Sequence, residues 1–284
     1  MIEIGIFTKT FVRPTLDSVL EAIAGQGLAV VQFNLASAGL PNLPETLAPG
    51  QIVAIRQAFA QHNLRMAALS GTFNMVHPDP RERRRGLHRL QGLVAACAGL
   101  DTQIITLSTG TRDPLDLWRA HPHNQAPDAW ADLLESMEAA VAIAEPAGVT
   151  LAFEPEISNV VDSAQRARRL LDEIRSPHLK VLIDGANLFH VGELPQMERI
   201  LHEAFELLGD DIVLAHAKDL THDGEAGQVA AGRGRLDYDL YIQLLHASGY
   251  HGALLLHSLG EDEVSASVAF LRARLQRARS RAGE

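Results

Sequence analysis

Hydrophobic positions along the chain fall into short runs separated by longer stretches with helical periodicity. The runs are rich in Val, Ile and Leu and are nearly continuous in apolar character. Such runs are typical of strands that are buried on both faces, as in a parallel sheet. Eight of them occur, at residues 2–7, 28–34, 66–70, 103–108, 149–154, 179–184, 212–216 and 252–257.

The stretches between these runs predict amphipathic helices. In residues 126–146, for example, Leu133, Met137 and Val141 recur at helical spacing, and Gly148 follows as a stop signal. Thr15 is a suitable N-cap for the first helix. The expected helices are 15–25, 50–62, 80–98, 126–146, 162–175, 194–208, 237–248 and 261–279.

A strand followed by a helix, repeated eight times without a linker, predicts an α/β fold of the (β/α)₈ TIM-barrel type. We expect one domain over residues 1–284. The alternative is a doubly wound open sheet. Against it, no G-x-G-x-x-G follows the first strand, and the segment GRGRLDY at 232–238 carries Asp237 where the third glycine would stand.

Charge and composition narrow the function classes. The chain has 25 basic and 35 acidic residues, a net charge of −10, which disfavours nucleic acid as a partner. No apolar run approaches the ~20 residues of a membrane span, and the first residues do not resemble a signal peptide. Cys97 is the single cysteine, which fits a reducing compartment. We therefore expect a cytoplasmic protein with a small-molecule substrate, and homo-oligomer formation remains open.

Ionisable side chains stand where four consecutive strands end. These are Glu154, Asp184, His216 and His257. Active sites of TIM barrels lie at the C-terminal ends of the strands, so these side chains should converge around one axis. Buried carboxylates are costly unless they are paired or bind a metal, and a mixed oxygen and nitrogen set suits Mn²⁺, Co²⁺, Zn²⁺, Fe²⁺ or Mg²⁺. The alternative is a salt-bridged polar plug in the barrel mouth.

Further polar residues are expected around the same mouth. Lys218 is a candidate for polarising a substrate oxygen, and its alternative role is an ion pair with Asp184 or Asp219. The segment of about residues 109–126 is long enough to be a lid or binding loop. Candidate substrate-binding residues are Lys9, His77, Trp118, Glu156, His190 and Arg233.

Several motifs resemble the xylose isomerase-like TIM-barrel superfamily. They are NMVHPDP (74–80), FEPE (153–156), DGAN (184–187), HAKD (216–219) and GRGRLD (232–237). FEPE, DGAN and HAKD follow three successive predicted strands in this order. The superfamily contains sugar phosphate isomerases and epimerases as well as DNA repair enzymes of the endonuclease IV type. The resemblance covers roughly residues 2–262.

The resemblance implies a metal-dependent isomerase or epimerase that acts on a sugar, a sugar phosphate or a related polyol. Family epimerases hold the metal through Glu, Asp, His and Glu on strands five to eight, and the first three carry over onto Glu154, Asp184 and His216. The fourth position is His257 instead. Because the two Glu residues of those epimerases are the acid and base groups, Glu154 remains a candidate base and His257 is either a ligand or the second proton-transfer group.

Three other functions stay open at this point. One is an abasic-site endonuclease, which the charge of −10 disfavours. Another is a non-catalytic barrel that binds a sugar-like ligand. A third keeps the metal but dehydrates or hydrolyses a polyhydroxy acid.

Overall fold

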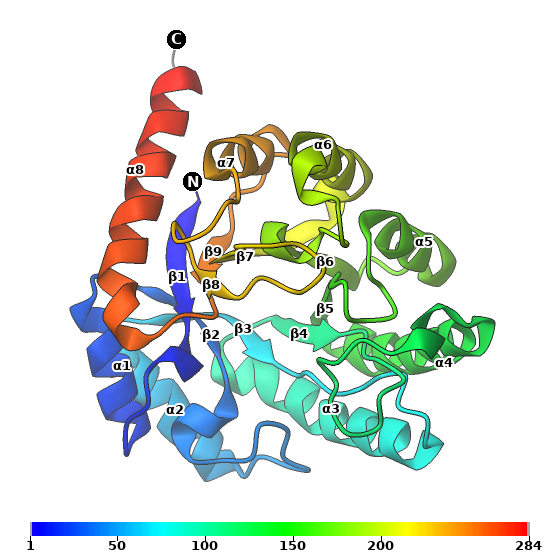
Figure 1. The fold of residues 1–284 in the computed structure, drawn as a ribbon. Helices are drawn as coiled ribbons and strands as arrows, with labels where there is room; N and C mark the ends of the chain where they lie inside the picture. Colours follow the sequence, from blue (N-terminus) through cyan, green and yellow to red (C-terminus); the bar gives the residue numbers. More distant parts are fainter. Residues whose placement is uncertain (1, 283–284) are drawn as a thin grey trace.

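Eight parallel strands close into a barrel surrounded by helices in the computed structural model, which describes residues 2–282 (Figure 1). The barrel strands are β1 (Glu3–Phe7), β2 (Val30–Phe33), β3 (Arg65–Ser70), β4 (Ile104–Ser108), β5 (Thr150–Glu154), β6 (Leu179–Asp184), β7 (Ile212–Asp219) and β9 (Ala253–Leu256). The helices are α1 (Leu16–Gly25), α2 (Pro49–Gln61), α3 (Pro80–Leu100), α4 (Pro127–Ala144), α5 (Ala164–Ile174), α6 (Met197–Leu208), α7 (Tyr238–Ala247) and α8 (Val264–Ala282).

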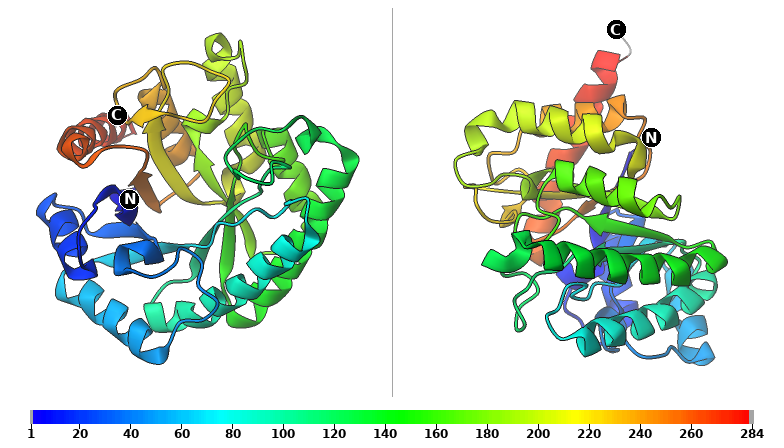
Figure 2. Two further views of the ribbon diagram at one scale, coloured as in Figure 1. Left: turned by 60° about the horizontal axis from the view of Figure 1, so that its bottom comes forward. Right: turned by 90° about the vertical axis from the view of Figure 1, so that its right-hand side faces the viewer.

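The strand order establishes the closure. Each strand from β1 to β6 pairs in parallel with the next one along the chain, β6 pairs with β7, β7 with β9, and β9 with β1. The short β8 (Val229–Ala230) is antiparallel to the end of β7 and stands outside the barrel. Figure 2 shows the helices arranged as an outer ring. The prediction of a single-domain TIM barrel is confirmed, and the open sheet is excluded.

The expected elements match the observed ones closely, and local chemistry explains several helix ends. The hydroxyl of Thr15 accepts the backbone N–H of Ser18, as an N-cap should. Asp79 caps α3 through the N–H of Arg81, and this helix runs two residues beyond the expected end before Asp101 adopts a left-handed conformation. Met1, Gly283 and Glu284, at the ends of the expected domain, lie outside the described residues.

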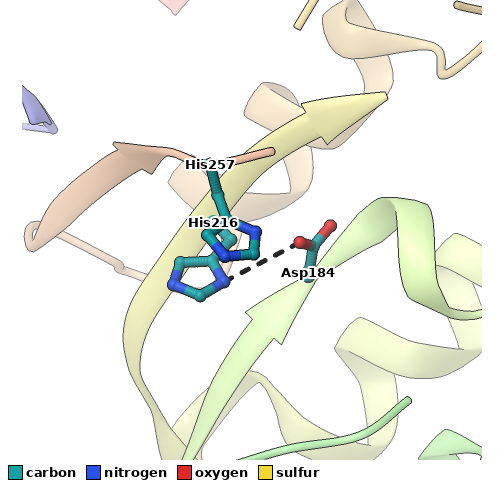
Figure 3. Close-up of side chains that lie close together, drawn as sticks. All are labelled: Asp184, His216 and His257. Carbon is teal, nitrogen blue, oxygen red and sulfur yellow. Dashed lines mark ion pairs between the residues drawn. The ribbon is translucent and has the colours of Figure 1, made fainter. Parts of the chain in front are cut away.

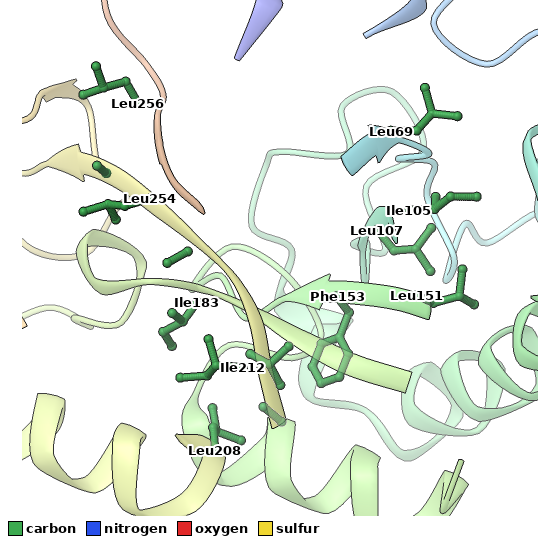
Figure 4. Packing of buried hydrophobic residues seen from close by; sticks show 14 of the residues in the cluster. Leu69, Ile105, Leu107, Leu151, Phe153, Ile183, Leu208, Ile212, Leu254 and Leu256 are labelled. Carbon is green, nitrogen blue, oxygen red and sulfur yellow. The ribbon is translucent and has the colours of Figure 1, made fainter. Parts of the chain in front are cut away.

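Two apolar layers hold the barrel together. Most buried side chains form a large core between the outer surface of the strands and the helices (Figure 4). A smaller cluster is separate from it and takes residues from six strands: Val30, Ala68, Ala152, Leu182, Leu214, Ala253 and Leu255. Since side chains alternate across a strand, this second cluster fills the barrel interior. Among residues 2–282, none of the helices combines the length and apolar character needed to cross a lipid bilayer.

Candidate metal and sugar site

A polar layer lies directly above the interior apolar cluster. Side chains two residues apart on a strand point to the same face, so each interior apolar residue is followed by an inward residue nearer the mouth. The pairs are Val30 and Gln32, Ala68 and Ser70, Ala152 and Glu154, Leu182 and Asp184, Leu214 and His216, and Leu255 and His257. Alternation along the strands therefore turns the four predicted metal-site residues inward near the mouth, and Asp184 and His216 are direct register partners.

A cavity of about 700 Å³ opens above this layer. This volume falls within the usual range of small-molecule sites, ~300–1,000 Å³. Gln32, Ser70 and Thr106 contribute to its floor together with Glu154 and His216. Side chains at and beyond the strand ends contribute further lining, among them Lys9, Trp118, Glu156, Lys218 and His257. The mouth is thus built at the C-terminal ends of the strands, where the sequence predicted it.

Asp184, His216 and His257 form a group that is suited to a metal ion. One ligand atom from each lies within 4.8 Å of the others. They come from β6, β7 and the end of β9, and the two imidazole rings are stacked with their centroids 4.9 Å apart (Figure 3). One carboxylate and two imidazoles match the ligands that first-row divalent metals accept.

The hydrogen bonding of the Asp184 carboxylate tests whether these residues suit a metal ion. Its Oδ1 accepts the N–H of Ala186, while Oδ2 is buried and accepts no hydrogen bond from the described residues. That oxygen lies 3.8 Å from His216 Nδ1 and 3.6 Å from Lys218 Nζ. Buried polar atoms normally have a hydrogen-bond partner. A buried carboxylate oxygen that lacks one and faces an imidazole nitrogen therefore fits the role of a metal ligand.

Glu154 stands beside this group. Its Oε1 lies 3.3 Å from His216 Nδ1 and accepts a hydrogen bond of 2.8 Å from Asn187 Nδ2. Burial alone would raise the pKa of Glu154. The interactions with His216 and Lys218 and the hydrogen bond from Asn187 outweigh burial, so the pKa of Glu154 is lowered. Glu154 is therefore held as a carboxylate that can ligate a metal or accept a proton.

Lys218 forms the ion pair with Asp184 that was one of its two predicted alternatives. The ammonium group is buried, which would lower its pKa, but Asp184, Glu154 and Glu156 outweigh burial and raise it. Lys218 therefore remains a cation. An amine that stays protonated is a poor nucleophile, so Lys218 is suited to binding an oxygen rather than to forming a Schiff base.

Asp219, next to Lys218 in the sequence, holds the backbone of the segment after β7. Its Oδ1 accepts the N–H groups of Leu220 and Leu236, and its Oδ2 accepts the N–H of Gly232. One buried carboxylate thus holds three backbone donors of the segment after β7. The HAKD and GRGRLD motifs meet through this contact, and Asp219 has a structural role in it.

Glu156 adds a second carboxylate to the cavity. It accepts a hydrogen bond from the hydroxyl of Ser158 and is only 5% exposed. Burial, and then the charge of Glu154, raise the pKa of Glu156 to about 7. Glu156 can therefore carry a proton near neutral pH, unlike Glu154.

His257 lies between two rings at the strand-eight position. Its imidazole stacks on His216 and contacts Phe7, whose ring centroid is 5.3 Å away. Burial, and then the electrostatic effects of His216, Lys218 and Lys9, keep the pKa of His257 well below its ordinary value. A neutral imidazole has a free lone pair, so His257 can act as a ligand or accept a proton.

The loop after β4 is anchored at its base and open at its tip. The amide oxygen of Asn124 accepts the Thr111 hydroxyl and the Arg112 N–H, while its amide nitrogen donates to the Ser158 carbonyl. Arg112 pairs with Asp132 of α4 at 2.6 Å. At the tip, Trp118 is 51% exposed and lines the cavity. The predicted loop is therefore fixed at its base by hydrogen bonds, and it places one aromatic side chain, Trp118, at the mouth of the cavity.

Three predicted substrate-binding residues lie outside the cavity lining formed by the described residues. His77 accepts the Asp79 N–H at Nδ1 and lies 3.2 Å from the Pro114 carbonyl at Nε2, so it ties α3 to the loop after β4. The side chain of His190 lies 3.9 Å from Asp162, beside a separate hollow between α5 and α6. Arg233 is exposed in the turn after β8.

Three residues of the site were not singled out from the sequence. Gln32, Ser70 and Thr106 belong to the polar layer, whereas Asn187, which contacts Glu154, is the last residue of the DGAN motif. The signal for Gln32 was a single polar residue inside the apolar run LAVVQFN. Alternation counted back from the strand ends would have placed it inside the barrel.

Comparison with known proteins agrees with this geometry. A family profile described as xylose isomerase-like TIM barrel matches residues 20–274. The chain belongs to this family. No curated protein matches the sequence significantly.

Several solved structures share the fold across nearly the whole chain. A D-tagatose 3-epimerase-like protein superposes with a TM-score of 0.78 and 13% identity over 99% of this chain and 100% of its own. L-ribulose 3-epimerase gives 0.76 and 17% over 100% and 97%. The IOLI protein, whose structure has a bound zinc atom, gives 0.75 and 15% over 98% and 99%. At these identities the likeness is one of fold.

Proposed function

We propose that the protein is a divalent-metal-dependent isomerase or epimerase that acts on a sugar, a sugar phosphate or a related polyol. The observation that carries the proposal is the convergence of Asp184, His216 and His257 beside the carboxylate Glu154. Glu154, His216 and His257 line a cavity of sugar-binding size, and Asp184 is buried directly behind them. The structural neighbours named as sugar epimerases support the substrate class.

Asp184, His216 and His257 would hold the ion, with Glu154 as a further ligand. When bound, a divalent ion acts as a Lewis acid toward the carbonyl and hydroxyl oxygens of a sugar. The ion pair with Asp184 holds the positive charge of Lys218 beside the proposed ligands, and Lys218 lines the cavity. Lys218 would therefore stabilise negative charge on the substrate and orient its oxygens.

Glu154 is the proposed base. Its lowered pKa keeps it ionised, and the hydrogen bond from Asn187 fixes one of its oxygens. It would take the proton from the carbon next to the substrate carbonyl. General base catalysis of this kind contributes ~10²–10⁴-fold to the rate.

His257 decides between the two reaction types. Epimerisation normally needs a proton-transfer group on each face of the sugar, whereas isomerisation can proceed with one base. The neutral imidazole of His257 comes from a different strand than Glu154, so it is the candidate for the second face. If His257 serves only as a ligand, a one-base isomerisation follows.

Side chains on the wall would bind the rest of the substrate. Trp118 offers an aromatic face to the apolar side of a sugar ring, and Lys9 and Glu156 offer polar contacts to hydroxyl groups. Glu156 can also donate a hydrogen bond when it is protonated. The net charge of −10 argues against DNA as the substrate.

Solvent deuterium uptake tests the proposal. The protein, loaded separately with Mn²⁺, Co²⁺, Zn²⁺ or Mg²⁺, is incubated in D₂O with keto- and aldo-sugars, their phosphates and inositol-type polyols. We expect deuterium at a carbon next to a carbonyl for at least one substrate, and a loss of ~10²–10⁴-fold in Glu154→Gln. Absence of uptake across the panel, with metal binding demonstrated, would contradict the proposed chemistry.

A further inference from the structure

Gln32 connects His216 to the opposite side of the barrel. Its side chain lies in the polar layer and is 4% exposed. The amide oxygen is 2.7 Å from His216 Nε2, and the amide nitrogen is 3.2 Å from the Ser70 hydroxyl and 3.1 Å from the Thr106 hydroxyl. Hydrogen bonds from β2 therefore reach β3, β4 and β7 through one side chain.

The two nitrogens of His216 face different partners. Nδ1 lies 3.3 Å from Glu154 and 3.8 Å from Asp184, on the side of the metal group. Nε2 lies on the side of Gln32. A neutral imidazole carries its proton on one nitrogen only, and a nitrogen that binds a metal must have a free lone pair. Metal binding at Nδ1 therefore requires the proton on Nε2.

We propose that Gln32 is a positioning residue that holds His216 in the Nε2–H tautomer and so keeps Nδ1 free for a metal. Its amide oxygen is the acceptor for that proton. The inference rests on the proposed metal site, because it assigns Gln32 the task of preparing one of its ligands. Partners that orient a ligating histidine in this way are typically worth ~10–100-fold in metal affinity.

The opposite orientation of the Gln32 amide defines the competing state. A reversed amide would donate to Nε2, and Nδ1 would then carry the proton and donate it to Glu154. The hydroxyls of Ser70 and Thr106 can each donate or accept, so they satisfy both orientations. In the structure the amide oxygen faces Nε2 and the amide nitrogen faces the two hydroxyls, an orientation that accepts a proton from Nε2 and cannot donate one to it.

Two substitutions distinguish the role of the Gln32 amide oxygen as a hydrogen-bond acceptor from the role of the side chain in packing. Gln32→Met keeps the length of the side chain but removes the carbonyl acceptor. Gln32→Glu keeps an acceptor for Nε2–H and cannot donate to the imidazole. In Co²⁺ titrations of metal-free protein, we expect Kd to rise ~10–100-fold in Gln32→Met and to stay at or below the wild-type value in Gln32→Glu. Thermal melting of each variant monitors folding, and Thr106→Ser, which keeps the hydroxyl, is the matched control.

Nitrogen NMR of ¹⁵N-histidine-labelled protein reads the tautomer without any metal. The His216 signals are assigned by their absence in His216→Ala. We expect a protonated Nε2 in the wild type and in Gln32→Glu, and loss of the Nε2 proton in Gln32→Met. A wild type that fails to bind Co²⁺ would contradict the metal site, and the NMR comparison would still decide the role of Gln32. Equal weakening of Co²⁺ binding in Gln32→Met and Gln32→Glu, or an unchanged tautomer in Gln32→Met, would overturn the inference.

Discussion

Removal of the Asp219 carboxylate should destabilise the segment that follows β7. In Asp219→Ala the N–H groups of Leu220, Gly232 and Leu236 lose their acceptor. A hydrogen bond to a charged group contributes ~1.5–3 kcal/mol, so three of them give an upper range of ~4.5–9 kcal/mol. Such bonds are not additive, and water can reach exposed Gly232 after truncation. We therefore expect a loss of about 3–5 kcal/mol in the free energy of unfolding.

Urea denaturation followed by circular dichroism measures this loss. Typical domains unfold with ~5–15 kcal/mol, so the expected change is a large share of the total. Asp219→Asn keeps one oxygen acceptor but turns an amide donor toward a backbone N–H, so it should lose about 2 kcal/mol. Asp237→Asn is the matched control, because Asp237 is an exposed N-cap of α7 and Asn is an equally good cap. A loss below ~1 kcal/mol in Asp219→Ala would refute the structural role of this carboxylate.

Four further outcomes are expected. If His257 transfers a proton, His257→Gln should retain its metal and lose ~10²–10⁴-fold in turnover, whereas a ligand role predicts that metal affinity falls with activity. Treatment with a chelator should lower the melting temperature, and added Mn²⁺, Co²⁺ or Zn²⁺ should restore it, because a bound ion stabilises the folded state; an unchanged melting curve would indicate a polar plug. Trp118→Ala should raise KM with little change in stability, since the ring is exposed at the mouth. Burial would raise the pKa of Asp211, but its contacts with Lys180 and Arg168 outweigh burial and lower it. The Asp211 carboxylate therefore stabilises the folded protein above its unfolded pKa, and this contribution disappears as pH falls through the lowered value. Asp211→Asn should be less stable than the wild type at pH 7, by ~1–2 kcal/mol, and equally stable in acid.

The fold was predictable because the runs of apolar residues mark whole strands and their order along the chain. Strands such as 179–184 contain almost no polar residue before their last position, so Asp184 marked both the end of the strand and its place at the mouth. Glu154, His216 and His257 were predictable for the same reason. Continuous apolar character does not, however, distinguish the inward from the outward face of a strand. Gln32 was therefore missed although it stands in the same layer.

Loop residues were less predictable because their positions depend on contacts between distant segments. His77 occurs in a motif beside the mouth, but its ring is bound to Asp79 and Pro114. Arg233 follows the strand that carries His216, yet the turn at Gly232 leaves it exposed. No spacing rule in the sequence encodes these contacts.

The stacked layers inside the barrel have a consequence for how such a protein can change through evolution. Leu255 of β9 belongs to the apolar layer, and His257, directly after the end of β9, belongs to the layer above it. Exchange of a carboxylate for an imidazole at the upper position alters the chemistry offered to a ligand, while the lower position continues to hold the strands together. Each of the six strands that contribute to the interior apolar cluster thus leads to one position that selection can vary separately from the scaffold. New activities can then arise by single substitutions that leave folding intact.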